Sequence, residues 1–304
     1  MLTEQQKNEI IDLIRIAEGQ LGNLTAVANK CGVSNATITL ILQNKYETKK
    51  DDMWLSIGRT LGWRPDGWNI AETSTNRSIY RLLQSAQQQS MFIRVSEKAG
   101  AGKSTGVNWY MSKQKTNVYR VICRSWGAKE FLEHIVKNIG ASAGNGYKST
   151  DDLLQVIIDH FKRKSGKPLL IIDQANSLKP ACLNNLIHLF NELEDHISVA
   201  LFGTENLKKD FERGVKYAKK GYDELDSRFA RTYVSLNFYT FADVTSIAHA
   251  NGIANKDVVA EIWDELKPIN HTIENKTIDV VLDGRRIKRL IQKYLLLTSL
   301  QSAA

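Results

Sequence analysis

The sequence lacks the features that mark several protein classes. No apolar run approaches the roughly 20 residues that a membrane helix needs, and the first helix-like stretch, MLTEQQKNEIIDLIRIAE, carries charge throughout, unlike a signal peptide. Cysteine is scarce, and Cys31, Cys123 and Cys182 lie far apart without CxxC spacing, which indicates neither a disulfide framework nor a zinc cluster. We therefore expect a cytoplasmic protein without membrane contact, whose cysteines act as small buried hydrophobes.

Hydrolase signatures are missing as well. The six histidines form no HExxH, and no GxSxG occurs. Paired acids such as Asp151 and Asp152 fall on helix-like surfaces, where solvated charge is the usual explanation. Metal hydrolases and serine nucleophiles therefore have little support.

Acidic residues are absent from one stretch that is rich in bases. Between Lys98 and Lys129 there are seven lysines and arginines and no Asp or Glu, in a chain of 304 residues with net charge +8. Residues 1–66, by contrast, balance to roughly zero net charge. This distribution indicates a polyanionic partner that meets the middle of the chain.

Residues 1–66 are interpreted as an all-α helix-turn-helix domain of the lambda-repressor-like type. The stretch NLTAVANKCGVSNATITLILQNKY places one short helix before a turn at Gly32 and a second after the capping residue Ser34. The side chains that such a unit presents to a DNA groove or phosphates include Asn35, Thr37 and Lys45. A packing module without DNA contact is the alternative, because the segment has no net charge.

Residues 67–237 are predicted to form an α/β domain with a parallel sheet. Strand-like runs (MFIRV, VYRVIC, LLIID, SVALFG and TYVSL) alternate with helical stretches, as in a sheet with crossover helices. We expect the strand at 169–172 to lie beside the first strand, and the polar segment 64–78 to be a linker. Residues 238–304 read as an all-helical lid.

A phosphate-binding loop follows the first strand in SEKAGAGKST. In such a loop, backbone N–H groups cradle phosphates, Lys103 reaches the β- and γ-oxygens, and Ser104 holds Mg²⁺. The matching residues are Gly100, Ala101, Gly102, Lys103, Ser104 and Thr105. ATP and Mg²⁺ are therefore the expected cofactors. The pattern departs at Glu97, where glycine is usual; a positive φ there would cost a glutamate about 1 to 2 kcal/mol.

A second motif, PLLIIDQANSL, ends a strand in Asp173 and Gln174. Asp173 is placed to hold the water shell of Mg²⁺, whereas Gln174 stands where an ATPase carries the carboxylate that polarises water. Without that base, hydrolysis is expected to fall by about 10² while binding survives.

A third motif, SVALFGTEN, ends another strand. Its Thr204 or Asn206 can touch the γ-phosphate or the attacking water.

Two pairs of arginines complete the set. In DELDSRFARTYVSL, Arg228 and Arg231 precede a strand, where an arginine can reach a neighbouring subunit's γ-phosphate. Surface salt bridges are the alternative interpretation of the same residues. In DGRRIKRLIQKY, Arg285 and Arg286 begin a helix from which one of them can approach the nucleotide of its own chain.

These motifs in this order resemble the AAA+ ATPases. With the segment SNATITLILQNKY before them, the chain is similar to the family of the bacteriophage Mu transposition protein B and, more distantly, to IstB-type helper ATPases. The resemblance implies ATP-dependent oligomerisation into filaments on double-stranded target DNA, delivery of that DNA to a transposase, and stimulated strand transfer. It also implies a DNA path inside the filament, contacted through phosphates.

Candidates for those phosphate contacts are few. Arg124 and Lys129 flank the loop after the second strand, and Lys216, Lys219 and Lys220 form a cluster that a solvated loop would also explain. Trp126 can stack on a base or belong to the core.

Gln174 also bears on the state of the protein. Glutamine at the place of the water-polarising acid is expected to hold such an assembly bound to ATP, whether the residue is natural or engineered. Two other functions fit the same motifs, namely a transcription regulator with an ATPase module and a helicase-loading replication initiator.

Overall fold

The computed structural model describes residues 2–43, 45–46, 51–63, 67–114, 116–144, 146–236, 238–273 and 276–302. Within this part of the chain, no helix has both the length and the apolar character to cross a membrane. The three cysteines are buried and free, as their spacing predicts.

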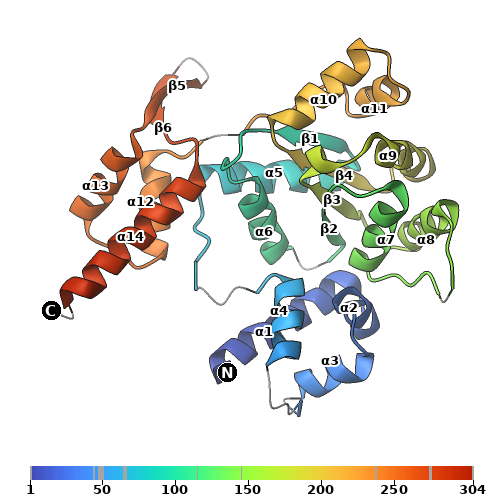
Figure 1. Cartoon of the computed structure of the whole chain (residues 1–304), viewed down its shortest axis with the longest axis horizontal. Coiled ribbons are helices and arrows are strands. Elements are labelled where there is room, and N and C mark those ends of the chain that lie inside the picture. The colour runs from blue at the N-terminus through green and yellow to red at the C-terminus, as the bar shows by residue number, and fades with distance from the viewer. Residues whose placement is uncertain are drawn as a thin grey trace.

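The chain begins with four helices, drawn in blue in Figure 1. They are α1 (Glu4–Leu21), α2 (Leu24–Cys31), α3 (Asn35–Leu42) and α4 (Asp52–Leu61). Gly32 has a φ of 71°, a left-handed conformation that glycine adopts without strain and that ends α2. The Ser34 hydroxyl then accepts the N–H of Thr37 and caps α3. The two helices thus have the spacing and turn that the sequence predicts.

A four-stranded parallel sheet forms the centre of the molecule. Its strands are β1 (Phe92–Ser96), β2 (Val118–Ile122), β3 (Leu169–Asp173) and β4 (Ser198–Gly203), in the order β1-β4-β3-β2. The expectation that β3 lies beside β1 is wrong, because β4 is inserted between them. Strand order depends on contacts between distant segments, which sequence spacing does not encode.

The strand expected from TYVSL is reduced to one bridge. Val234 pairs with Val95 on the free edge of β1. The preceding residues Ala230 and Arg231 both have positive φ values, so the chain reaches the sheet from a turn. Two residues further on, the amide of Leu236 donates to the Glu97 carboxylate instead of a strand carbonyl, and the ladder ends there.

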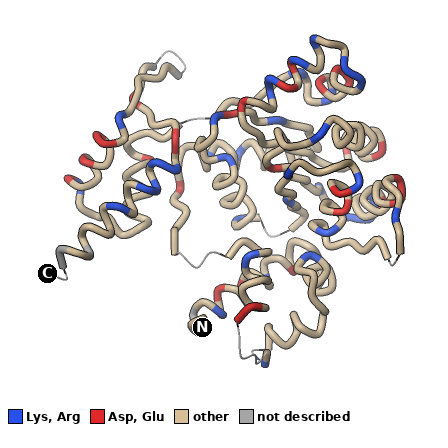
Figure 2. The backbone as a smooth tube through the Cα atoms, in the orientation of Figure 1, with Lys and Arg blue, Asp and Glu red and all other residues tan. Residues whose placement is uncertain are grey.

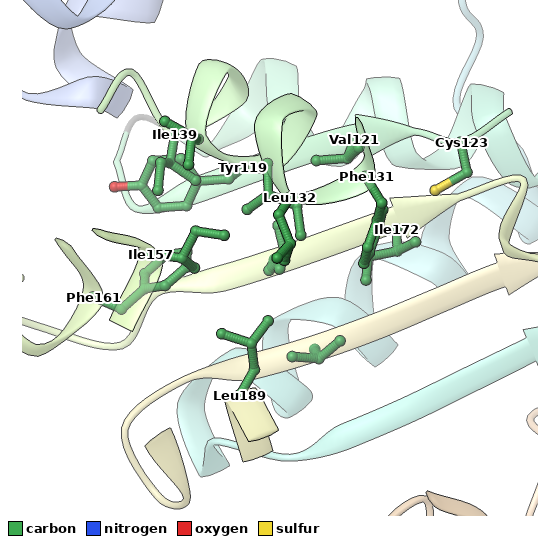
Figure 3. Packing of buried hydrophobic residues seen from close by; sticks show 14 of the residues in the cluster. Tyr119, Val121, Cys123, Phe131, Leu132, Ile139, Ile157, Phe161, Ile172 and Leu189 are labelled. Carbon is green, nitrogen blue, oxygen red and sulfur yellow. The ribbon is translucent and has the colours of Figure 1, made fainter. Parts of the chain in front are cut away.

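Helices cover both faces of the sheet (Figure 1). On one face lie α5 (Ser74–Gln89) and α6 (Lys103–Lys113), which share a core with β1 and β4. The other face carries α7 (Ala128–Asn138), α8 (Thr150–Lys162) and α9 (Pro180–Leu193). Figure 3 shows Phe131 and Phe161 among the buried side chains on this face. All residues of β3 and β4 are buried, as expected for strands between two helical layers.

The buried side chains of the N-terminal helices continue into this second core. Specific hydrogen bonds join the two regions: the Gln20 side-chain amide donates to the carbonyls of Met111 and Gln114 at 3.0 Å. Gly140 lies so close to Ala26 that an added Cβ would be 2.7 Å from the alanine Cβ. The N-terminal helices are therefore docked on the sheet domain.

The expected linker at 64–78 is only partly a connection. Residues 64–66 lie outside the described part, and Ser74–Ser78 already belong to α5.

After β4 come α10 (Glu205–Lys216) and α11 (Tyr222–Arg228), and then a small C-terminal unit with its own core. It contains α12 (Phe241–Ala250), α13 (Lys256–Leu266), β5 (Ile269–Ile273), β6 (Lys276–Val280) and α14 (Gly284–Ser302). The expectation of an all-helical lid is wrong, since β5 and β6 pair as an antiparallel hairpin. The β-branched residues Thr277, Ile278 and Val280 favour this extended conformation.

Candidate nucleotide site

A cavity of about 510 Å³ opens at the carboxyl ends of β1, β3 and β4. Its walls come from the loop after β1, the ends of β3 and β4, residues 68–76 and the start of α14. Parallel sheets bind ligands at this edge, because the loops that follow the strands converge there.

The loop after β1 has the conformation of a phosphate cradle. Gly100 and Gly102 have φ values of 88° and 83°, and Gly102 caps the N-terminus of α6. An added Cβ at Gly100 would lie 2.2 Å from the Asp283 carboxylate, so a side chain is excluded. The N-terminus of α6 points backbone N–H groups and its dipole at the cavity, which favours an anion.

Glu97 is compatible with this loop. It is not among the described residues with positive φ, so the cost considered for glutamate does not arise. Its carboxylate accepts the N–H of Leu236 at 3.2 Å and thereby ties the loop to the segment after α11.

Lys103 is folded back onto the loop. Its ammonium donates to the carbonyls of Glu97 and Lys98 at 2.6 and 2.7 Å. Burial lowers the pKa of Lys103, and the charges of Glu97 and Asp173 act in the opposite direction. The lysine lines the cavity and can exchange these carbonyls for phosphate oxygens.

Asp173 is buried at the end of β3 and is surrounded by donors. Ser104 Oγ donates to its Oδ2 at 2.8 Å, and the N–H of Gln174 donates to its Oδ1 at 2.9 Å. The guanidinium of Arg120, on β2, pairs with the same Oδ2 and with the amide oxygen of Asn108. The sequence reasoning missed Arg120 and Asn108, although an arginine inside the apolar run VYRVI was a signal.

The donor set beside the phosphate loop fits magnesium. A carboxylate (Asp173) and a hydroxyl (Ser104) are the oxygen ligands that Mg²⁺ accepts together with phosphates and water. A bound Mg²⁺ would neutralise phosphate charge between the nucleotide and these two side chains.

Gln174 and Thr204 face the cavity from two neighbouring strand ends. Gln174 is exposed and adopts a left-handed conformation with φ of 58°. Asn176, which sequence reasoning did not single out, accepts the N–H of Thr204 at 3.0 Å and so fixes the β4 tip. The hydroxyl of Thr204 is buried and has no hydrogen-bond partner among the described residues. Asn206, the alternative to Thr204, does not line the cavity.

The start of α14 closes the cavity from the lid. Gly284 donates its N–H to the carbonyl of Gly100 at 2.9 Å, and the Asp283 carboxylate accepts the N–H of Arg285. Arg285 lines the cavity. Arg286 does not, because its guanidinium turns away and donates to the carbonyl of Glu265 at 3.1 Å.

Residues 68–76, expected to be a mere connection, supply the apolar wall. Trp68 and Ile70 from this segment line the cavity together with Ile247 of α12, and Asn69 lines it as well while its side-chain amide donates to the carbonyl of Ala250 at 2.9 Å. Apolar side chains with a few polar groups suit a flat nucleobase.

Arg228 and Arg231 lie away from this cavity. Arg228 is paired with Glu224 at 3.0 Å and rests on the ring of Phe190. Arg231 pairs with Asp223 at 2.8 Å. Neither can serve the nucleotide site of its own chain in this conformation.

The candidate DNA contacts lie on several surfaces. Figure 2 shows lysines and arginines gathered along α10 and the turn into α11, where Lys216, Lys219 and Lys220 are exposed. Arg124 is also exposed, whereas Lys129 is half-buried under the ring of Tyr147. Trp126 is buried and stacks on His134, so it belongs to the core. Asn35 and Lys45 are exposed on and after α3, and the Thr37 hydroxyl is engaged with Ser34.

Comparison with known proteins agrees with this geometry. The AAA domain family model matches residues 86–211. The chain is 24% identical over 250 residues to the Mu-like prophage FluMu DNA transposition protein B of Haemophilus influenzae, an alignment that covers 79% of this chain and 84% of that protein.

Solved structures agree on the fold. Cdc6p from Pyrobaculum aerophilum superposes with a TM-score of 0.52 at 14% identity, covering 75% of this chain and 62% of that one. The ADP form of the Aeropyrum pernix ORC2 protein gives 0.51 at 13% identity, covering 80% and 66%. The chain thus spans less than two thirds of either structure. Residues 86–211 thus match an AAA domain that carries the phosphate loop, and the chain is similar to the DNA transposition protein B of a Mu-like prophage.

Proposed function

We propose that this chain is an ATP-dependent, DNA-binding regulator of transposition. It assembles into filaments on double-stranded target DNA, delivers that DNA to a transposase and stimulates strand transfer. The resemblance to a transposition protein over 79% of the chain supports this choice among the many functions of the fold.

The hydroxyl of Thr204, which has no partner among the described residues, is the main support for a preference for ATP over ADP. A buried polar group without a partner among the described residues is costly, and this hydroxyl belongs to a residue that lines the cavity. A γ-phosphate oxygen at the β4 tip satisfies it, whereas ADP leaves it unpaired. Arg285, which lines the cavity from the lid, adds a charge that senses the same phosphate.

The position of Arg228 and Arg231 supports the proposed assembly. They sit near α11, outside their own cavity, and each is held by a carboxylate on the protein surface. A neighbouring subunit can offer its γ-phosphate to Arg228 in place of Glu224, which couples ATP to oligomerisation. ATP is then bound between two copies of the chain.

DNA is held through its phosphates. Lys216, Lys219 and Lys220 are exposed at one end of α10, and Arg124 is exposed after β2. Lysine and arginine without base-reading geometry give affinity that depends on salt and little on sequence. Gln174 then keeps the assembly in its ATP state, because an amide cannot accept the proton of the attacking water.

The direct test is the affinity for labelled duplex DNA with ATP, with ADP and with neither, together with electron microscopy of the same samples. We expect tight binding and filaments with ATP alone, and Lys103→Ala serves as the control that removes the phosphate contact. Equal DNA affinity with ATP and ADP, without filaments, would refute the proposal.

The two alternative functions are a transcription regulator and a helicase-loading replication initiator. The first would read DNA through the N-terminal helices, and the second would bind a helicase instead of a transposase. Deleting residues 1–66 is a poor test, because their core continues into the sheet domain and deletion would expose it. Substituting the exposed Asn35 and Lys45 by alanine leaves that core intact. A transcription regulator would lose specific binding in this variant, whereas the filament former keeps its affinity. Capture of a helicase rather than a transposase would indicate an initiator.

A further inference from the structure

We propose that Arg120 is a built-in counter-ion that occupies Asp173 when Mg²⁺ is absent and competes with Mg²⁺ for it. The inference rests on the proposed nucleotide site and concerns how that site handles its metal. It assigns a role to a residue that none of the motifs includes.

The placement of Arg120 is unusual for a strand residue. In the sheet register Arg120 lies opposite Ile171, and Ile122 lies opposite Asp173. Arg120 is therefore two residues before the end of β2 and of its partner β3. Its side chain must run along β2 to reach the Asp173 carboxylate. Both partners are almost fully buried, with 12% and 3% of their side chains exposed.

The carboxylate has little hydrogen-bonding capacity to spare. Oδ2 receives Ser104 and Arg120, and Oδ1 receives the N–H of Gln174. Asp173 and Ser104 would hold a magnesium ion directly or through its water shell, and Arg120 occupies the same Oδ2 as Ser104, so the guanidinium competes with the metal and its water for this oxygen. Asn108 offers an anchor for the displaced arginine, since its amide oxygen already accepts from the other guanidinium nitrogen.

The positive charge of Arg120 determines how this residue changes the Mg²⁺ requirement of the site. A buried carboxylate without a partner is strongly unfavourable, so Arg120 stabilises the site before the metal binds. The same positive charge repels a divalent cation that approaches the same oxygen. Arg120 therefore supports the metal-free site and raises the Mg²⁺ concentration that nucleotide binding requires.

The experiment measures binding of a fluorescent ATP analogue while Mg²⁺ is titrated from an EDTA buffer. It compares the unaltered chain with Arg120→Gln, which keeps a donor but loses the charge, and with Arg120→Lys, which keeps the charge. The exposed Arg163, remote from the cavity, provides the matched control Arg163→Gln.

We expect Arg120→Gln to lower the half-saturating Mg²⁺ concentration by about tenfold, because it removes the repulsion between the guanidinium and the cation at the same carboxylate. Arg120→Lys and Arg163→Gln should keep the original value. An unchanged or higher Mg²⁺ requirement in Arg120→Gln overturns the inference and makes Arg120 only a support for Asp173. If the unaltered chain binds no nucleotide with or without Mg²⁺, the proposed nucleotide site itself fails.

A second measurement needs no substitution at all. Because Arg120 already satisfies Asp173, Mg²⁺ without nucleotide should leave the melting temperature of the unaltered chain unchanged to within about 1 °C. A large stabilisation by Mg²⁺ alone would contradict competition, even if the Arg120 variants do not fold.

Discussion

Restoring the carboxylate at position 174 gives the sharpest prediction. Gln174→Glu changes one atom of an exposed side chain that lines the cavity. The backbone is held at φ 58° by two hydrogen bonds, from the Gln174 N–H to Asp173 and from the Ser177 N–H to the Gln174 carbonyl. Glutamate pays the same conformational cost as glutamine, so we expect stability to change by no more than about 0.5 kcal/mol.

The effect on hydrolysis should be much larger. A general base in reach of the attacking water contributes typically about 10² to 10⁴ in rate. Thr204 and Lys103 line the same cavity, and the carboxylate supplies the general base that glutamine cannot provide. We therefore expect turnover to rise by about 10² or more, while nucleotide affinity changes only about twofold, because the added base acts in the transition state.

The assay is steady-state phosphate release with Mg²⁺ and saturating duplex DNA. Gln174→Ala controls for loss of the amide, and the double variant Gln174→Glu/Lys103→Ala reports contaminating activity. If Gln174→Glu binds ATP and DNA as the unaltered chain does and still shows no turnover, the assignment of position 174 is wrong. Nucleotide would then act only as an assembly ligand.

Three further predictions concern DNA binding, docking and pH. Replacing Lys216, Lys219 and Lys220 by alanine should reduce the slope of log affinity against log salt by about 3, whereas the triple variant at Lys162, Lys256 and Lys267 should leave it unchanged. Gln20→Ala should lower the free energy of unfolding in urea by about 1 to 3 kcal/mol, because it removes both side-chain bonds to the end of α6; the exposed Gln155→Ala should have little effect. Burial lowers the pKa of His160 from 6.5 to about 4, so the unfolded chain binds the extra proton first as the pH falls. This contribution to the free energy of unfolding should be complete above pH 6.5 and should be lost as the pH falls toward 4. The loss should reach about 2 kcal/mol after allowance for solvent screening. Urea titrations of His160→Gln should lack this decline.

Much of the site was predictable because its parts are local. The glycines that place the phosphate loop in left-handed conformations, the lysine that opens α6 and the acid that ends β3 all lie within a few residues of the backbone they shape. The same holds for the caps of the N-terminal helices, such as Ser34 before α3. Short-range sterics and hydrogen bonds determine such features, so the sequence alone specifies them.

Tertiary structure decided the remainder. The insertion of β4 between β1 and β3, the wall formed by residues 68–76, and the choice of Arg285 over Arg286 all depend on segments far apart in the chain. Asn176 contacts Thr204 because the tip of β4 lies beside it, and Arg120 contacts Asp173 because β3 lies beside β2. A buried polar side chain takes whichever partner the packing supplies, and that partner is fixed by the fold as a whole.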